Sequence, residues 1–201
     1  MLKKIPFTTI EPILTRYQLS DEAKAVLTPN MQVEQAITVL SQQKLLSDAI
    51  QLIAHGLGVI EAIFWGCKCL ALREEQWDKN QVLAINSALK WLQTPNETLR
   101  IRADQLAERI GLESGPAWLA KSVYWSGTGS IVAPELPAVM PPPFLYAHAI
   151  ASAITIAAAV PQWQENDIGY EKFFQHGITL GLNIANGEKI QINLLTESKE
   201  H

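Results

Sequence analysis

Apolar residues recur at spacings of three and four along most of this 201-residue chain, which is the spacing of helices that bury one face. One such stripe is Val33, Ile37 and Leu40, and it continues to the residues before Gly56. The helices expected from these stripes and their flanking residues cover about 21–27, 33–55, 59–72, 80–92, 95–110, 115–126, 144–160 and 170–185. The pattern predicts a mostly α-helical fold, a single-domain multi-helix bundle. Trp65, Leu106, Trp118 and Ile154 are expected in its core.

The clearest boundary signal lies ahead of the fifth of these helices. Thr94 and Pro95 offer an N-cap hydroxyl followed by proline at the first helical position, and Glu97 completes the pattern of a capping box. Gly111 is expected to end this helix. Asn186-Gly187 gives a C-terminal signal for the last one.

The chain divides into three parts on this basis. Residues 1–30 are expected to be irregular apart from one short helix, residues 31–187 form the helical domain, and residues 188–201 form a short strand and a tail. The strand is predicted because apolar and polar residues alternate over Ile190–Leu194. A lone strand needs a partner, and Ile5–Ile10 is the candidate.

Gly127–Pro143 interrupts the helical pattern. It combines glycine and serine with five prolines, ending in three in a row, so it can be neither a helix nor a central strand. We expect an ordered strap that lies extended, partly as polyproline II, across the surface.

Two uses of this strap are open. It either staples the alanine-rich helix that follows it to Trp118 and Trp125, or it presents Leu136 and Met140 as a ridge for a protein partner. The candidate partner-binding residues are Trp125, Leu136, Met140 and Phe144.

Charge and composition exclude several classes of protein. The formal net charge is −4 with a pI near 5.6, and no basic run is longer than Lys3-Lys4, so nucleic-acid binding is not expected. The weakly polar stretch 144–160 would span roughly 25 Å as a helix, which is short of a hydrocarbon core of roughly 30 Å. We therefore expect a buried central helix, no membrane insertion, and no signal peptide at the N-terminus.

The two cysteines are expected to be buried structural residues. Cys67 and Cys69 are too few for a disulfide framework, which favours a reducing, cytoplasmic compartment. On a helix, residues two apart point roughly 200° away from each other, so the two thiols cannot face one metal ion. No metal site and no cofactor are expected.

The histidines and the glycine-rich turn carry no recognisable catalytic pattern. No metal-binding or nucleophile spacing links His55, His148, His176 and His201. His55 is expected to cap a helix end as an imidazolium, and His148 is expected to be a hydrogen-bonded core residue rather than a base. The turn Gly127–Ser130 lacks the lysine of a phosphate loop and follows a helix.

Glu61 is the ionisable residue that stands out, because apolar residues surround it over Val59–Trp65. It is either a possible functional carboxylate with a shifted pKa or a residue on the polar edge of a helix near its N-terminus. An alternative function follows from the first case: a small-molecule-binding or hydrolytic enzyme that uses Glu61 and His148 near Gly127–Ser130. That alternative requires the three to meet in one concave pocket.

Short sequence patterns follow one another between about His55 and Gly187. They are EAIFWGCKC at Glu61–Cys69, then Pro116–Ala120, Tyr124–Ser130, Ala133–Pro137, Pro141–Pro143 and Gly181–Gly187. These segments resemble the EAVWWACxC segment, the AGWLALAAFWSGGSLAPPDLPxVPPPP signature and the closing GLDVAxG of an uncharacterised family of bacterial helical proteins. The chain departs from this family at Thr128, which replaces a glycine, and at Val132, near the first proline.

The resemblance implies a function rather than a reaction. Members of that family are often encoded beside specialised secretion machinery, so the resemblance implies a non-enzymatic adaptor or chaperone-like accessory protein of a bacterial secretion system, with a role in virulence. Its partners would be secretion-machinery components or effectors. In size, acidity and helical content the chain is also similar to LvgA, the small adaptor of the Legionella type IV coupling complex, although no residues are aligned to it.

Overall fold

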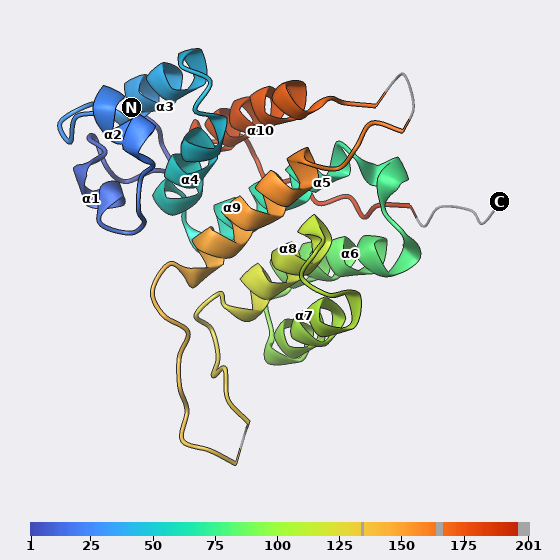
Figure 1. Ribbon diagram of the computed structural model, residues 1–201. Coiled ribbons are helices and arrows are strands. Elements are labelled where there is room, and N and C mark those ends of the chain that lie inside the picture. Colours follow the sequence, from blue (N-terminus) through green and yellow to red (C-terminus); the bar gives the residue numbers. More distant parts are fainter. Residues whose placement is uncertain (134, 164–166, 197–201) are drawn as a thin grey trace.

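The computed structural model describes residues 1–133, 135–163 and 167–196, and these fold into one helical bundle (Figure 1). The helices are α1 (Glu11–Leu14), α2 (Asp21–Val26), α3 (Val33–Gln42), α4 (Leu46–Gly56), α5 (Val59–Ala71), the 3-10 helix η1 (Glu74–Gln76), α6 (Lys79–Gln93), α7 (Glu97–Ile110), α8 (Gly115–Tyr124), α9 (Leu145–Ala158) and α10 (Tyr170–Ala185). Within the described residues the only β-pairing is an isolated bridge between Thr9 and Gln32. The predicted fold class is confirmed.

The alanine-rich helix α9 lies at the centre of the bundle, as expected, and packs against α4, α5, α8 and α10 (Figure 1). Small residues let the neighbouring helices approach closely. A Cβ on Gly115 of α8 would lie 2.6 Å from the carbonyl oxygen of Ala153, so glycine is required at this crossing. No helix in the described part of the chain is both long enough and apolar enough to cross a membrane.

Trp65 joins α5 to α10 inside the core. Its ring is fully buried, and its indole N–H donates a hydrogen bond of 2.7 Å to the carbonyl oxygen of Gly177. A Cβ on Gly181 would lie 3.0 Å from the same ring, so α10 carries glycine where the tryptophan crosses it. Of the four expected core residues, Trp65, Leu106 and Ile154 are buried. Trp118 is only half-buried, because its N–H donates to the carbonyl oxygen of Leu112 near the surface.

The start of α7 differs from the prediction. Thr94 is the C-cap of α6, and the N-cap of α7 is Asn96, whose side-chain oxygen accepts the backbone N–H of Leu99 at 2.9 Å. Pro95 therefore lies between the two helices rather than at a first helical position. The side-chain oxygen of Asn96 accepts the kind of capping hydrogen bond that was predicted for the hydroxyl of Thr94, so α7 begins two residues later than predicted.

The N-terminal thirty residues are more ordered than expected. They contain α1 as well as α2, and Ile5, Ile10 and Ile13 are completely buried. Because these isoleucines are spaced by five and three, they do not form a helical stripe, although they belong to the core.

The predicted strand at Ile190–Leu194 is not formed. These residues are extended without β-pairing, and the candidate partner Ile5–Ile10 contributes Thr9 to the bridge with Gln32 instead. The side chain of Asn86 replaces a β-partner, because its amide group donates to the carbonyl oxygen of Leu195 at 3.0 Å and accepts the N–H of Leu195 at 2.8 Å. Asn86 of α6 thus holds the C-terminal segment together with Glu74 of η1, whose carboxylate accepts the backbone N–H of Thr196 at 2.9 Å.

Candidate functional site

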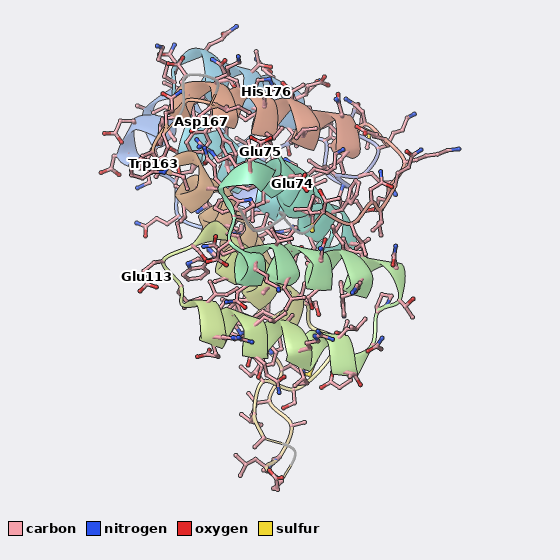
Figure 2. All side chains as sticks on the ribbon, turned by 90° about the vertical axis from the view of Figure 1, so that its right-hand side faces the viewer. Glu74, Glu75, Glu113, Trp163, Asp167 and His176 are labelled. Carbon is pink, nitrogen blue, oxygen red and sulfur yellow. The ribbon has the colours of Figure 1, made fainter. Side chains whose placement is uncertain are left out.

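Residues 127–143, here called the proline-rich arm, leave the bundle between α8 and α9 and project away from it. Both perpendicular views show the arm extending beyond the helices (Figures 1 and 2). Leu136, Val139 and Met140 are 58%, 49% and 51% exposed. The segment therefore projects from the helices rather than lying across their surface as expected, and the exposure of Leu136 and Met140 favours the second of its two open uses. Pro134, also in the arm, lies outside the described residues.

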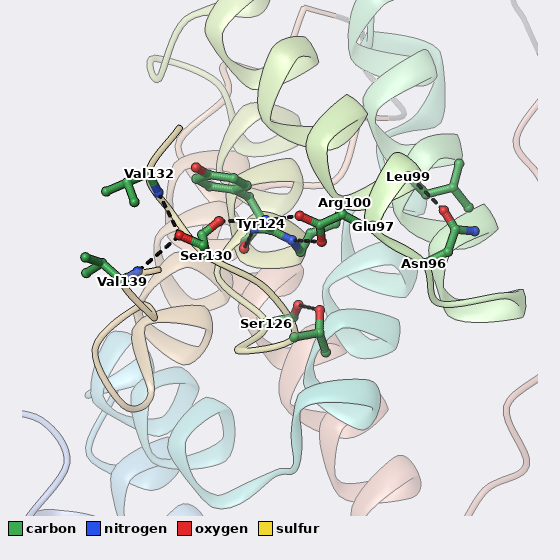
Figure 3. A network of polar contacts seen from close by, with 10 residues as sticks. Asn96, Glu97, Leu99, Arg100, Tyr124, Ser126, Ser130, Val132 and Val139 are labelled. Carbon is green, nitrogen blue, oxygen red and sulfur yellow. Dashed lines mark hydrogen bonds and ion pairs between the residues drawn. The ribbon is translucent and has the colours of Figure 1, made fainter. Parts of the chain in front are cut away.

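A buried arginine anchors the first limb of the arm (Figure 3). Arg100 of α7 is 1% exposed, and its guanidinium donates to the carbonyl oxygens of Tyr124 at 2.8 Å and Ser130 at 2.7 Å. Glu97 accepts two further bonds from it at 2.7 and 2.6 Å. These bonds lower the pKa of Glu97 and raise that of Arg100. A Cβ on Gly129 would lie 2.6 Å from Nε of Arg100, so the turn passes the guanidinium with no room for a side chain.

The two limbs of the arm are tied together at a neck. The hydroxyl oxygen of Ser130 accepts the backbone N–H groups of Val132 at 3.2 Å and Val139 at 3.1 Å (Figure 3). The N–H of Ile131 also donates to the carbonyl oxygen of Val139 at 2.8 Å. The part of the arm beyond the neck is therefore a closed loop with a defined base.

The turn before the neck accommodates the departure at Thr128. Gly127 takes the left-handed conformation, with φ +83°, so Thr128 does not need a positive φ. The hydroxyl groups of Thr128 and Ser126 lie 2.9 Å apart and form a hydrogen bond. Threonine fits at position 128 because Gly127 takes the positive φ that the turn requires.

The four candidate partner-binding residues do not share one environment. Leu136 and Met140 are exposed on the arm, whereas Trp125 and Phe144 are half-buried at its two ends. The ring of Trp125 meets that of Trp118 edge to face, with centroids 6.4 Å apart. Phe144 has a positive φ of 62° and precedes α9 as its N-cap. Trp125 and Phe144 therefore lie where the arm meets the bundle, and Leu136 and Met140 contribute to the exposed surface of the arm.

Glu61 lies in the first turn of α5, on the polar edge of the helix. Its side chain is 20% exposed, and Oε1 pairs with Nζ of Lys4 at 3.0 Å. Oε2 lies 3.0 Å from the position that a Cβ on Gly58, the N-cap, would occupy. A carboxylate here stabilises the positive end of the helix dipole. The arrangement matches the structural interpretation of Glu61.

The three groups that an enzyme would need do not meet. Glu61 lines a cleft of about 340 Å³ together with Lys3, Lys4, Pro6, Phe7, Arg16, Gly56, Leu57, Gly58 and Tyr146. Neither His148 nor the turn Gly127–Ser130 lines that cleft. His148 instead contacts the ring of His55, and the turn contacts Arg100.

His55 is neutral rather than the expected cationic cap. Its ring is buried, stacks on Tyr17 with centroids 4.6 Å apart, and meets His148 edge to face at 4.5 Å. Burial lowers the pKa of His55 to about 4. A cation does cap this end of α4, but it is Arg16, which donates to the carbonyl oxygen of His55 at 2.6 Å. The capping role predicted for His55 is wrong because the ring is desolvated.

Cys67 and Cys69 are both buried, as predicted, and both are free thiols. Burial raises the pKa of each thiol, which keeps them protonated. Among the residues that the structure describes, no cluster of three or more histidine, cysteine, aspartate or glutamate side chains could hold a metal ion.

A second cleft, of about 280 Å³, lies where α5 ends, and Glu74, Glu75 and Asp167 lie on this side of the molecule (Figure 2). Arg73 is 3% exposed there and donates to the carbonyl oxygens of Ile168 at 2.7 Å and Ala158 at 3.3 Å. Its guanidinium also lies 5.0 Å from the ring centre of Phe173. These contacts connect the end of α5 to the end of α9 and to α10, which indicates a structural role for Arg73.

Sequence reasoning missed the buried and half-buried arginines that carry these contacts. Arg100 is a charged residue in a helix whose buried face is expected to be apolar, and Arg16 lies in a stretch expected to be irregular. The available signal for Arg100 was its spacing from Ala103 and Ala107, which puts it on the same buried face.

The comparison with known proteins identifies a family but no activity. Residues 36–181 match the family of unknown function DUF6931. No curated protein and no solved structure matches the chain. Since the match covers most of its length, the chain belongs to the DUF6931 family. The matched region includes the whole arm and its anchor Arg100 and leaves out the first 35 residues.

Proposed function

We propose that this DUF6931 protein works by binding another protein, and that the proline-rich arm is its contact surface. The observation that carries the proposal is an arm that projects from the bundle with Leu136, Val139 and Met140 about half exposed. Exposed apolar groups gathered on one feature mark interaction sites more often than exposed apolar residues scattered singly.

The anchoring of the arm supports the same proposal. A loop that must be ordered on binding loses conformational entropy, which weakens the complex. Here the buried Arg100 and the Ser130 neck already fix the base of the arm, so less entropy is lost when a partner binds. Proline further restricts the unbound conformations of the arm.

The chemistry of the arm favours a partner with an apolar, aromatic-lined groove. Glu135 is the only charged residue between Gly127 and Pro143, so binding should depend weakly on salt. The second limb contains Pro137 and Pro141–Pro143, which have no backbone N–H and so cannot pair as a central β-strand. Proline-rich segments of this kind bind in grooves lined by aromatic rings.

The cellular role is proposed from the resemblance described above. An adaptor or chaperone-like accessory protein of a bacterial secretion system, working in the cytoplasm, would bind machinery components or effectors in this way. The enzymatic alternative lacks the shared cleft it requires, since the cleft at Glu61 contains neither His148 nor the Gly127–Ser130 turn.

Partner capture with arm variants tests the proposal. The double variant Leu136→Glu and Met140→Glu places two charges on the arm, and Leu112→Glu is a matched control because Leu112 is 40% exposed outside the arm. The tagged proteins are used to capture partners from the source bacterium, followed by mass spectrometry. We expect the double variant to lose a protein that the wild type and the control retain, with no change in melting temperature.

Two outcomes contradict the proposal. If the double variant captures the same proteins as the wild type, the arm is not the contact surface. If the double variant unfolds, Leu136 and Met140 contribute to the core, which their exposure argues against. A photo-crosslinking residue at position 140 gives a second measurement, because it should label the same partner in the folded protein.

A further inference from the structure

Arg16 lies between two aromatic rings in the cleft that contains Glu61. Its guanidinium carbon is 4.6 Å from the ring centre of Phe7 and 4.2 Å from that of Phe144. One hydrogen bond is described for it, to the carbonyl oxygen of His55. A guanidinium has five N–H donors, so most of them are left without an acceptor in the described chain.

Arg16 also has no carboxylate partner. Among the described residues, every ion pair involves another cation, and Glu61, the carboxylate that lines the same cleft, pairs with Lys4. Burial lowers the pKa of Arg16, as expected for a partly desolvated cation without a counterion. An anion beside Arg16 would raise the pKa of its guanidinium again.

The cleft itself has an excess of positive charge. Lys3, Lys4 and Arg16 line it against the single carboxylate of Glu61, although the chain as a whole carries a net charge of −4. Lys3 is exposed and forms no ion pair with a described residue. Two cations, Arg16 and Lys3, therefore remain available at the same cleft.

We propose that this cleft binds a carboxylate group of an acidic peptide, with Arg16 holding the carboxylate oxygens and Lys3 adding a second positive charge. The two rings cover the faces of the guanidinium and one of its N–H groups donates to His55, so the remaining N–H groups are available for the paired N–H···O bonds that suit a carboxylate. Pro6 and Phe7 supply an apolar wall for the neighbouring part of the peptide. The volume of about 340 Å³ falls in the range of small ligand sites.

The excess of positive charge in the cleft attracts a carboxylate and a phosphate alike. Glu61 already contributes a negative charge to the cleft and occupies the N-terminal turn of α5. A phosphate group carries a charge of about −1.5 to −2 at neutral pH, so both its attraction to the cations of the cleft and its repulsion by Glu61 exceed those of a carboxylate, and the competition experiment below distinguishes the two groups. This binding site does not depend on the arm and would exist whether or not the arm binds a partner.

Peptide binding tests the proposal. A fluorescein-labelled hexaglutamate peptide and a hexaglutamine peptide with the same label are compared by fluorescence anisotropy at low ionic strength. We expect the wild type to bind hexaglutamate and not hexaglutamine. Arg16→Gln should weaken hexaglutamate binding by about tenfold or more, since it removes a charge-assisted bidentate contact. Lys3→Gln should weaken it by a smaller factor.

Controls separate binding from folding. Arg102→Gln removes an exposed arginine of α7 that does not line the cleft, and it should bind like the wild type. Arg16 contacts two rings and a helix end, so its variant is also checked by thermal unfolding. Lys3→Gln is a surface change that leaves the fold intact and therefore tests the site even if Arg16→Gln unfolds. In the wild type, the Nε resonance of Arg16 should shift when hexaglutamate is added.

Three results would overturn the proposal. The first is equal binding of the two peptides by the wild type. The second is unchanged hexaglutamate binding by both Arg16→Gln and Lys3→Gln. The third is displacement of the peptide by inorganic phosphate at lower concentration than by acetate, which would assign the cleft to a phosphate group instead.

Discussion

Replacing Arg100 by methionine should destabilise the protein and release the arm at the same time. Methionine fills a similar volume but removes both bonds to the carbonyl oxygens of Tyr124 and Ser130. A partly buried acceptor that loses a donor costs about 1–3 kcal/mol, and the guanidinium also lies 4.7 Å from the ring centre of Tyr124, a contact worth about 0.5–1 kcal/mol. Two acceptors and one ring contact together give an expected loss of about 2.5–7 kcal/mol in the free energy of unfolding.

The ion pair with Glu97 contributes little to that total. The Glu97 side chain is 60% exposed, so solvent screens the pair and its net value is about 0–1 kcal/mol. Glu97→Gln is therefore the matched control: it removes the charge and leaves both carbonyl bonds in place. Because the pKa of Glu97 is lowered in the folded state, its small contribution is present at neutral pH and is lost as the pH falls through its folded pKa.

Urea unfolding monitored by tryptophan fluorescence measures the loss of stability, and amide hydrogen exchange measures the order of the arm. In Arg100→Met the N–H groups of Val132 and Val139 should lose protection, because the Ser130 neck is no longer fixed to α7. In Glu97→Gln they should keep it. The reasoning is refuted if the two variants lose the same small amount of stability, or if the arm amides of Arg100→Met remain protected.

Other predictions follow from the core and the buried titratable groups. Leu106→Ala should lower the free energy of unfolding by about 2–5 kcal/mol, and an unchanged melting temperature would show that Leu106 is not packed as described. His55 is neutral in the fold with a pKa of about 4, so stability should fall as the pH drops from about 6.5 towards 4, and His55→Gln should show a smaller decrease in urea unfolding over this range. Cys67 and Cys69 should react with a thiol reagent only after unfolding, and stoichiometric zinc in the purified protein by elemental analysis would contradict their assignment as free buried thiols.

The helical segments were predictable because their signals are local. Apolar spacing identifies the buried face of a helix, and residues such as Gly111 mark its end whatever the rest of the chain does. The errors at Thr94 and at Ile190–Leu194 have a different origin. Asn96 lies two residues from Thr94 and makes the capping bond in its place, whereas Asn86, 109 residues away in sequence, holds the C-terminal segment at Leu195 without a β-partner. Whether Thr94 or Asn96 caps α7 depends on where α6 ends.

The candidate sites were less predictable because they depend on contacts between distant parts of the chain. Arg16 and Phe144 are far apart in sequence and meet only after α4 and α9 pack together. Glu61 stood out in the sequence as a charge among apolar residues, yet the fold places it at a helix terminus beside Lys4, where a carboxylate is stabilising. Local hydrophobicity alone could not distinguish that position from a buried one.

The arm shows why composition could not predict its direction. Prolines lower the entropy of the unfolded segment wherever it lies, so an ordered arm and an ordered strap are equally compatible with Gly127–Pro143. The direction is decided by Arg100, which holds the carbonyl oxygen of Ser130 against α7, and by the hydroxyl of Ser130, which closes the neck onto Val139. The closed neck holds Leu136 in the loop beyond it, where the side chain is exposed, and Met140, the residue after Val139, is exposed on the second limb. A buried guanidinium whose bonds go to the backbone of a projecting loop stabilises the presentation of that loop, and this links the energetics of Arg100 to the proposed binding role of the arm.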